Sequence, residues 1–438
     1  MPLITVIVTC YNVEKYLDDC LRSVVSQTLD DMEVIVVDDG STDDTAAIIR
    51  KFERADPRVR SILLPENTIG GVGSAANAGL DAATGDYIGF VDGDDYVERD
   101  MFEKMCDAAK NGHSELVVCR YLEFDGDTGE KREPAERSCW AGIRGETTWQ
   151  LDTPEKVNRA LGFIAVPWRK IYARALLDEN AIRFPVVDYY WEDNPFHWFS
   201  VCSAKSVSIV PEVLCYHRVG RAGQTMISQS PDFVKVFGHH ETIRAWLSDR
   251  GMLPQYEGAL LSWALSQYEW VVGRLTRESG GALYDALRAV VQTVDESALE
   301  RALQTKLRST GTMMRWVQHG DKRQFLEKFE RRFDAESSAS NAIGAKLERG
   351  VAMIGLAKEN MRVHGFRNTV SKVLMRVGVK TELSSSRNRG KGQALTDENM
   401  TKLLAILQRD IDRKHAEVLE KLRELEQDLK EGGGDRRQ

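Results

Sequence analysis

The sequence lacks three features: paired cysteines, a long apolar run and an excess of positive charge. Its seven cysteines are scattered, odd in number and never spaced as Cys-x-x-Cys. This pattern argues against a disulfide framework or a zinc site and predicts the reduced thiols of a cytosol. No apolar stretch approaches the roughly 18 residues that a membrane-spanning helix requires. The net charge of −8 disfavours a general nucleic-acid-binding protein, so we expect no nucleic-acid partner.

Residues 1–5 also lack the basic region, followed by an apolar segment and a cleavage site, that marks a signal peptide. The composition, with 42% hydrophobic and 29% charged residues, is that of an ordinary soluble globular protein. We therefore expect a cytoplasmic protein, either free or bound peripherally at the inner face of the cell membrane. The length of 438 residues indicates roughly three domains.

Apolar strands and amphipathic helices alternate through the first hundred residues. The expected buried strands are 3–8, 33–37, 59–64 and 88–91. The expected helices between them are 14–27, 45–52 and 75–83. This alternation implies right-handed crossovers and predicts an α/β fold with a doubly wound sheet. Further along, we expect a helix at 101–109, a strand at 116–119 and a charged loop at 125–137.

Three of the predicted strands are followed by polar clusters, and ligands bind such sheets beyond the carboxyl ends of the strands. The clusters are Thr9-Cys10-Tyr11-Asn12, Asp38-Asp39-Gly40-Ser41 and Asp92-Gly93-Asp94-Asp95. The last cluster offers the carboxylate oxygens that Mg²⁺ and Mn²⁺ prefer. An ordinary acidic turn is the alternative interpretation of that cluster, and a helix-capping turn that of the second.

The glycine-rich stretch Gly70-Gly71-Val72-Gly73-Ser74 is predicted to be a loop ahead of a helix of small residues. It is not a P-loop, because no Lys-Ser/Thr pair follows it. It is not a dinucleotide-binding fingerprint either, because it does not directly follow the first strand. On its own it carries no functional assignment.

Four ordered motifs resemble the signature of glycosyltransferase family 2. They are residues 6–12, 36–43, 77–79 and 85–96, and the resemblance extends over residues 2–227. It implies the GT-A fold, a doubly wound, mixed and mainly parallel sheet, followed here by a mostly α-helical C-terminal region. It also implies an inverting, hexosyl- or related transferase that uses a nucleotide-activated sugar.

The resemblance assigns a donor site to the strand ends. Asp92 and Asp94 would hold Mn²⁺ or Mg²⁺ together with the donor diphosphate. We leave His217 out of the metal ligands, because a lone histidine beside Tyr216 is more often structural. The residues expected to bind the nucleotide-sugar are Thr9, Tyr11, Asp39, Asp92, Arg218 and Arg221, the two arginines resembling a basic stretch that closes over the pyrophosphate in relatives.

A second acidic site, Glu192-Asp193, lies among aromatic residues. A carboxyl group in a partly apolar pocket has a raised pKa, which suits a general base. The family carries its base on such a pair, so we predict Asp193 as the base and Glu192 as a residue that orients it or binds the acceptor. A helix N-terminus with acidic first-turn residues is the alternative. Trp168 and Trp191 are predicted on the acceptor side, although a buried tryptophan closing the sheet is an equally good interpretation of Trp168.

One departure from the family leaves the donor open. Relatives usually read Ala-Arg-Asn-x-Gly where this chain has Ala75-Ala76-Asn77-Ala78-Gly79. The missing arginine removes a positive group near the nucleotide. A UDP-sugar is the leading donor, while dTDP-, GDP- and CDP-linked sugars stay open.

We expect four segments: a GT-A catalytic domain at 1–230, a helical accessory domain at 231–335, a basic amphipathic segment with a linker at 336–395, and a C-terminal helix with a short coiled coil at 396–438. Residues 346–391 carry eleven lysines and arginines against three acids. They predict either a peripheral contact with an anionic membrane or a solvated helical face. The helix at 396–431 predicts a homo-oligomer.

The predicted function is metal-dependent, inverting transfer of a sugar to a hydroxyl acceptor, which is a saccharide, a lipid-linked molecule or a polymer, in bacterial cell-envelope polysaccharide or other glycoconjugate biosynthesis. Two alternatives belong to other classes. A nucleotidylyltransferase-like enzyme would need a basic, glycine-rich loop right after the first strand, and residues 9–14 offer none. A silent GT-A scaffold acting through its C-terminal helices would be favoured by loss of an acidic motif, and all are present.

Overall fold

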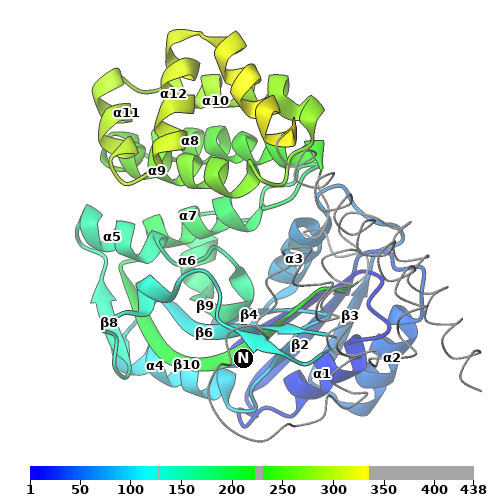
Figure 1. Ribbon diagram of the computed structural model, residues 1–438. Helices are drawn as coiled ribbons and strands as arrows, with labels where there is room; N and C mark the ends of the chain where they lie inside the picture. The colour runs from blue at the N-terminus through cyan, green and yellow to red at the C-terminus, as the bar shows by residue number, and fades with distance from the viewer. Residues whose placement is uncertain (127, 222–229, 335–438) are drawn as a thin grey trace, which may run out of the picture. The chain divides into compact units, whose positions relative to one another are not determined.

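β-Branched residues fill the strand at the centre of the fold, β1 (Ile4–Cys10), which is buried along its whole length. In the computed structural model, which describes residues 1–126, 128–221 and 230–334, β1 pairs in parallel with β2 (Met32–Asp38) on one side and β4 (Tyr87–Asp92) on the other. Figure 1 shows these strands side by side in the sheet. Their carboxyl ends therefore lie at one edge, where the polar clusters follow.

The described strands form one mixed sheet in the order β3-β2-β1-β4-β9-β6-β10-β5, with β7 on β6 and β8 on β10. The long pairings, including that of β6 with β10, are parallel, whereas β5, β7, β8 and β9 pair antiparallel with their neighbours. The expected mixed, mainly parallel sheet is confirmed. The remaining strands are β3 (Val59–Leu63), β5 (Tyr96–Val97), β6 (Leu116–Asp125), β7 (Lys131–Arg132), β8 (Thr147–Gln150), β9 (Lys170–Ala173) and β10 (Ser206–Val219).

Helices connect the parallel strands, as the sequence pattern predicted for 14–27, 45–52 and 101–109. The helices of this part are α1 (Leu17–Val25), α2 (Thr45–Ala55), α3 (Gly71–Ala82), α4 (Met101–Gly112), α5 (Pro154–Leu161), α6 (Arg174–Glu179) and α7 (Asp193–Ser203), with the 3₁₀-helices η1 (Arg137–Trp140) and η2 (Pro167–Arg169). Apolar side chains of the strands and of these helices form the main core.

The glycine-rich stretch was wrongly predicted as a loop, because α3 already begins at Gly71. Gly70 precedes it in the left-handed region, with φ of 94°. A Cβ on Gly73 would lie 2.9 Å from Cγ of Glu192 and 3.3 Å from Cβ of Phe184. The lack of side chains thus allows the first turn of α3 to pack against the segment that enters α7.

A mostly helical region follows the sheet, as expected. Its elements are η3 (Pro231–Phe237), α8 (Gly238–Asp249), α9 (Leu253–Val271), η4 (Arg277–Ser279), α10 (Gly280–Val291), α11 (Glu296–Leu303) and α12 (Arg308–His319). Helix α8 packs on α7 (Figure 1). The ring of Trp246 stacks there on Phe199, with the centroids 4.6 Å apart. The sheet and these helices belong to one compact unit, Met1–Leu326.

Several sequence predictions lie outside the described residues. They are the segments 336–395 and 396–438, with the basic stretch 346–391 and the helix 396–431. The domain boundaries at 230 and 335 stay predictions. Within the described ranges, no helix is both long and apolar enough to cross a membrane.

Candidate active site

The acidic turn after β4 is pressed against the end of β1. The backbone N–H of Gly93 donates to the carbonyl of Thr9 at 2.9 Å, and that of Asp95 donates to the carbonyl of Asp92 at 2.9 Å. A Cβ on Gly93 would lie only 2.9 Å from Sγ of Cys10, so a glycine is needed for this close approach. The turn thereby fixes the directions in which its three carboxylates point.

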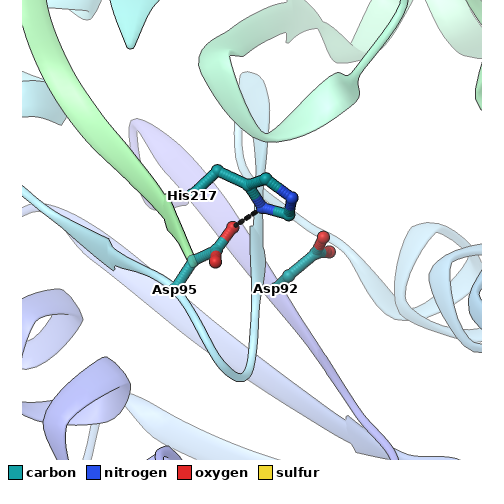
Figure 2. A group of neighbouring side chains, drawn as sticks. All are labelled: Asp92, Asp95 and His217. Atoms are coloured by element: carbon teal, nitrogen blue, oxygen red, sulfur yellow. Dashed lines mark hydrogen bonds and ion pairs between the residues drawn. The ribbon is translucent and has the colours of Figure 1, made fainter. Parts of the chain in front are cut away.

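Strand β10 adds a histidine to this turn. Its Tyr216 pairs with Tyr96 of β5, directly after the turn, which brings His217 beside Asp95. Nδ1 of His217 lies 2.9 Å from Oδ2 of Asp95. One ligand atom each from Asp92, Asp95 and His217 lie within 4.8 Å of one another, and Figure 2 shows the Asp92 carboxylate facing the same space as the imidazole. This group can hold a metal ion.

Burial and mutual proximity shift the protonation of the three residues in this group. Burial, with the carboxylates of Asp95 and Asp94, raises the pKa of Asp92 to about 8. Burial also raises the pKa of Asp95. Burial opposes protonation of His217, but the nearby carboxylates outweigh it and raise its pKa to about 9. Burial beside two other carboxylates thus disfavours the ionised form of Asp92, and a divalent cation at this group would stabilise that form.

Both predicted arginines reach the acidic turn. Nε of Arg221 donates to the Asp94 carboxylate. Nε of Arg218 donates to the carbonyl of Asp94 at 2.9 Å, and its backbone N–H donates to Oδ1 of Asp95 at 2.7 Å. Asp94 therefore faces Arg221, while Asp92 is grouped with Asp95 and His217. The metal-ligand pair predicted from the sequence, Asp92 and Asp94, stays a prediction. The group of Asp92, Asp95 and His217 is a second candidate set of ligands.

The predicted nucleotide residues lie at the ends of β1 and β2. Thr9 donates its hydroxyl to Oδ1 of Asp92 at 3.3 Å, and the neighbouring Tyr11 is 44% exposed. Asp39 is buried, and its carboxylate accepts hydrogen bonds from the Thr68 hydroxyl at 2.7 Å and from Asn67 Nδ2 at 3.0 Å. Burial raises its pKa despite these bonds. Asp39 thus holds the segment between β3 and α3 against the end of β2.

The acidic pair Glu192-Asp193 opens α7, so the alternative of an acidic helix start also describes it. Burial and the neighbouring Asp193 raise the pKa of Glu192 to about 7. Burial raises the pKa of Asp193 too, opposed by Lys170 and by hydrogen bonds from Asn194. The preceding Trp191 has φ of 72°, a left-handed conformation that is costly for a bulky residue.

Stacked aromatic rings connect the acidic turn with the acidic pair. Phe90 of β4 packs edge-on against Phe184 and Phe196, with centroids 5.6 and 5.9 Å apart. Phe184 and Phe196 stack on each other at 3.9 Å. Phe90 precedes Asp92 by two residues and Phe196 follows Asp193 by three, so one apolar cluster supports both groups.

The two predicted acceptor-side tryptophans have different surroundings. Trp168 is only 5% exposed, and its ring stacks on the His217 imidazole at 5.1 Å. This matches the interpretation of Trp168 as a buried residue. The ring of Trp191 packs edge-on against Phe233 and Trp270, at 5.1 and 5.6 Å.

Sequence reasoning set aside His217 and did not single out Thr68 or Asn194. A register for the strand at 206–219 would have placed His217 next to the acidic turn. Asn194 had one usable signal, its position directly after the predicted base. Thr68 had none.

The comparisons with known proteins agree with this architecture. The model of the family "Glycosyl transferase family 2" matches residues 5–173. An uncharacterized glycosyltransferase, EpsJ of Bacillus subtilis, is 33% identical over 231 residues, which are 53% of this chain and 65% of the relative. Glycosyltransferase GlyG of Streptococcus pneumoniae is 31% identical over 250 residues, covering 54% of this chain and 78% of the relative.

Among solved structures, residues 1–349 of Staphylococcus aureus TarS in complex with UDP-GlcNAc match with a TM-score of 0.62 at 22% identity, covering 77% of this chain and 92% of TarS 1–349. This likeness shows the GT-A fold. The chain belongs to glycosyl transferase family 2.

Proposed function

We propose that the chain is a metal-dependent, inverting glycosyltransferase that moves a sugar from a nucleotide-activated donor to a hydroxyl acceptor in cell-envelope polysaccharide or other glycoconjugate biosynthesis. The observation that carries the proposal is the joint placement of two acidic sites. Asp92, Asp95 and His217 lie at the carboxyl edge of the sheet, and Asp193 opens a helix packed on the same aromatic cluster as β4. Membership of the family supports it.

The residues at the acidic turn fit a divalent cation. Two carboxylates and an imidazole within 4.8 Å suit Mn²⁺, and additional oxygens from a diphosphate would complete its ligands or those of Mg²⁺. We propose that Asp92, Asp95 and His217 hold the ion. Asp94 would become a further ligand only if its ion pair with Arg221 breaks. The bound ion would stabilise the negative charge of the leaving diphosphate.

The nucleotide would lie beyond the ends of β1 and β2. We propose that Tyr11, Thr9 and Asp39 form its binding edge, Asp39 partly through its hydrogen bonds to the segment before α3. Arg218 and Arg221 already lie beside Asp94 and would offer their planar donor forks to the diphosphate. UDP is the leading nucleotide, supported by the structural likeness to a protein solved with UDP-GlcNAc.

Asp193 is the proposed base. As the acceptor oxygen forms its bond to the anomeric carbon, the bond from that carbon to the diphosphate oxygen breaks, and the hydroxyl proton passes to Asp193. Glu192 would orient Asp193 or bind the acceptor near Trp191. Trp168 would support the proposed metal ligand His217 by stacking on its imidazole.

The two alternative classes have less support. A nucleotidylyltransferase-like enzyme would not account for the family match, nor for an acid pair on α7. A silent scaffold would have no need for acidic groups with raised pKa values gathered at one sheet edge. Contact with a membrane through 346–391 and oligomerisation through 396–431 stay predictions.

The test is nucleoside diphosphate release from UDP-, GDP-, dTDP- and CDP-sugars, with Mn²⁺ or with EDTA. We expect release from one nucleotide class, lost in EDTA and restored by Mn²⁺. An Asp86→Asn variant, altered at an exposed acid just before β4, serves as the matched control and should behave like the unmodified chain. Nucleoside diphosphate release at the same rate in EDTA would contradict the proposed role of the metal. Failure to bind any of the four nucleotides would contradict the proposal that the donor is a nucleotide-sugar.

A further inference from the structure

The side chain of Asn194 links the proposed base to the helical region. Its Nδ2 donates to Oδ1 of Asp193 at 2.9 Å and to the carbonyl of Trp191 at 3.3 Å. Its Oδ1 accepts a hydrogen bond from Nε1 of Trp263, on α9, at 3.1 Å. Asn194 is buried, and both the nitrogen and the oxygen of its amide are hydrogen-bonded to protein groups.

Trp263 and the two acceptors opposite it together fix which end of the amide faces the base. An indole N–H is only a donor, so it pairs with the amide oxygen and not with the amide nitrogen. With the oxygen held by Trp263, the two N–H groups of Asn194 point toward Asp193 and Trp191. The reverse orientation would set the amide oxygen against the Asp193 carboxylate and an N–H against the indole N–H. Both contacts would be repulsive.

This hydrogen bond affects both the position and the basicity of Asp193. It holds one carboxylate oxygen, which leaves the other for the acceptor hydroxyl. It also stabilises the ionised form and so lowers the pKa of Asp193, against the effect of burial. The bond therefore keeps the base ionised over a wider pH range.

We propose that Trp263 is a positioning residue for the reaction: it orients the Asn194 amide, which in turn orients Asp193. The inference rests on the proposed role of Asp193 as base. It makes helix α9 part of the active site, although α9 begins 60 residues after Asp193 in the sequence. The helical region then contributes to catalysis through the hydrogen bonds of Trp263 and Asn194.

The experiment compares transfer kinetics of Trp263→Phe with those of the unmodified chain across pH. Phenylalanine keeps an aromatic ring but removes the N–H. We expect an unchanged KM for the donor, a lower kcat at neutral pH, and an acidic limb of kcat moved upward by about 0.5–1 pH unit. A purely structural role would lower the amount of active protein without moving the limb.

Trp246→Phe is the matched control. Trp246 also belongs to the helical region and packs on Phe199 of α7, so its variant should leave the limb in place. In an Asn194→Ala background, Trp263→Phe should cause no further shift, because both act on one hydrogen bond. Asn194→Ala alone should shift the limb upward, and it replaces Trp263→Phe in the test if that variant does not fold.

The two proposals fail in distinguishable ways. If Asp193→Asn abolishes transfer but neither Trp263→Phe nor Asn194→Ala moves the limb, only the positioning role is overturned. If Trp263→Phe shifts the acidic limb in the Asn194→Ala background by as much as it does alone, the positioning role is overturned as well. If Asp193→Asn retains full transfer, the base assignment fails and the positioning role fails with it.

Discussion

Nδ1 of His217 lies 2.9 Å from Oδ2 of Asp95, which joins strand β10 to the acidic turn across 122 residues of sequence. The same turn holds Asp92, which ends strand β4, and Asp94, which pairs with Arg221. One turn thus brings together the proposed metal ligands and both of the proposed diphosphate-binding arginines. The predictions below separate these roles.

Metal binding distinguishes the two ligand sets. Asp95→Asn should weaken Mn²⁺ binding about 10–100-fold, because it removes a proposed ligand that also holds His217. Asp94→Asn should weaken it less, since the Asp94 carboxylate pairs with Arg221. Titration of Mn²⁺ followed by electron paramagnetic resonance measures both, with Asp86→Asn as control. A larger loss for Asp94→Asn than for Asp95→Asn would favour the ligand pair predicted from the sequence.

As proposed, Asp39 would support nucleotide binding in two ways, by contacting the nucleotide and by holding Thr68. Asp39→Asn should weaken binding of the nucleoside diphosphate about 10–100-fold, because hydrogen bonds to a charged group are lost. Calorimetric titration in the presence of Mn²⁺ gives the affinity. Asp44→Asn, on the exposed N-cap of α2 after the same strand, should bind normally. Equal affinities of Asp39→Asn and Asp44→Asn for the nucleoside diphosphate would contradict a role of Asp39 in nucleotide binding.

The proposed role of Asp193 as base predicts a pH profile on which the neighbouring Glu192 has a limited effect. A base acts only when deprotonated, so a raised pKa places the acidic limb of kcat above the ordinary range of an aspartate. The Asp193 charge raises the pKa of Glu192, and by reciprocity any negative charge on Glu192 would raise the pKa of Asp193, so Glu192→Gln should leave the limb in place or move it to lower pH. Profiles at saturating donor and Mn²⁺ measure this. Glu179→Gln, at an exposed acid, is the control, and a limb that moves upward in Glu192→Gln would contradict the coupling.

Stability depends on a buried ion pair beneath the site. Arg169 and Glu136 are both buried and paired, and Glu136 also accepts a hydrogen bond from Trp140 Nε1 at 2.9 Å. Glu136→Gln leaves a buried guanidinium without its charge partner and should lower the free energy of unfolding by about 3–5 kcal/mol. Urea unfolding measures the loss. Glu133→Gln, at a more exposed ion pair, should cost less than about 1 kcal/mol.

Much of the sheet was predictable from sequence, because β1, β2 and β4 are apolar runs that end in polar clusters. The position of His217 was not, since it depends on the register between β10 and β5, which no local pattern encodes. The start of α3 was missed for a related reason. Gly70, Gly71 and Gly73 indicate a loop locally, whereas in the structure Gly73 leaves room for Glu192 and Phe184 from a distant segment.

The acidic pair shows the same limit. The residue type and aromatic neighbours pointed to Asp193, but the hydrogen bonds that orient it come from Asn194 and, through it, from Trp263 on α9. Likewise, Arg218 and Arg221 were predicted to bind a diphosphate, and no local pattern indicated the hydrogen bonds that both donate to Asp94. Partners of this kind arise from tertiary packing.

The most direct test of the central claim compares transfer with donor binding in Asp193→Asn. The asparagine keeps the shape of the side chain but has no basic carboxylate. We expect the affinity for the donor with Mn²⁺ to be unchanged and the rate of sugar transfer to fall about 10²–10⁴-fold. Full transfer by Asp193→Asn, with normal donor binding, would contradict the assignment of this chain's base and with it the proposed mechanism.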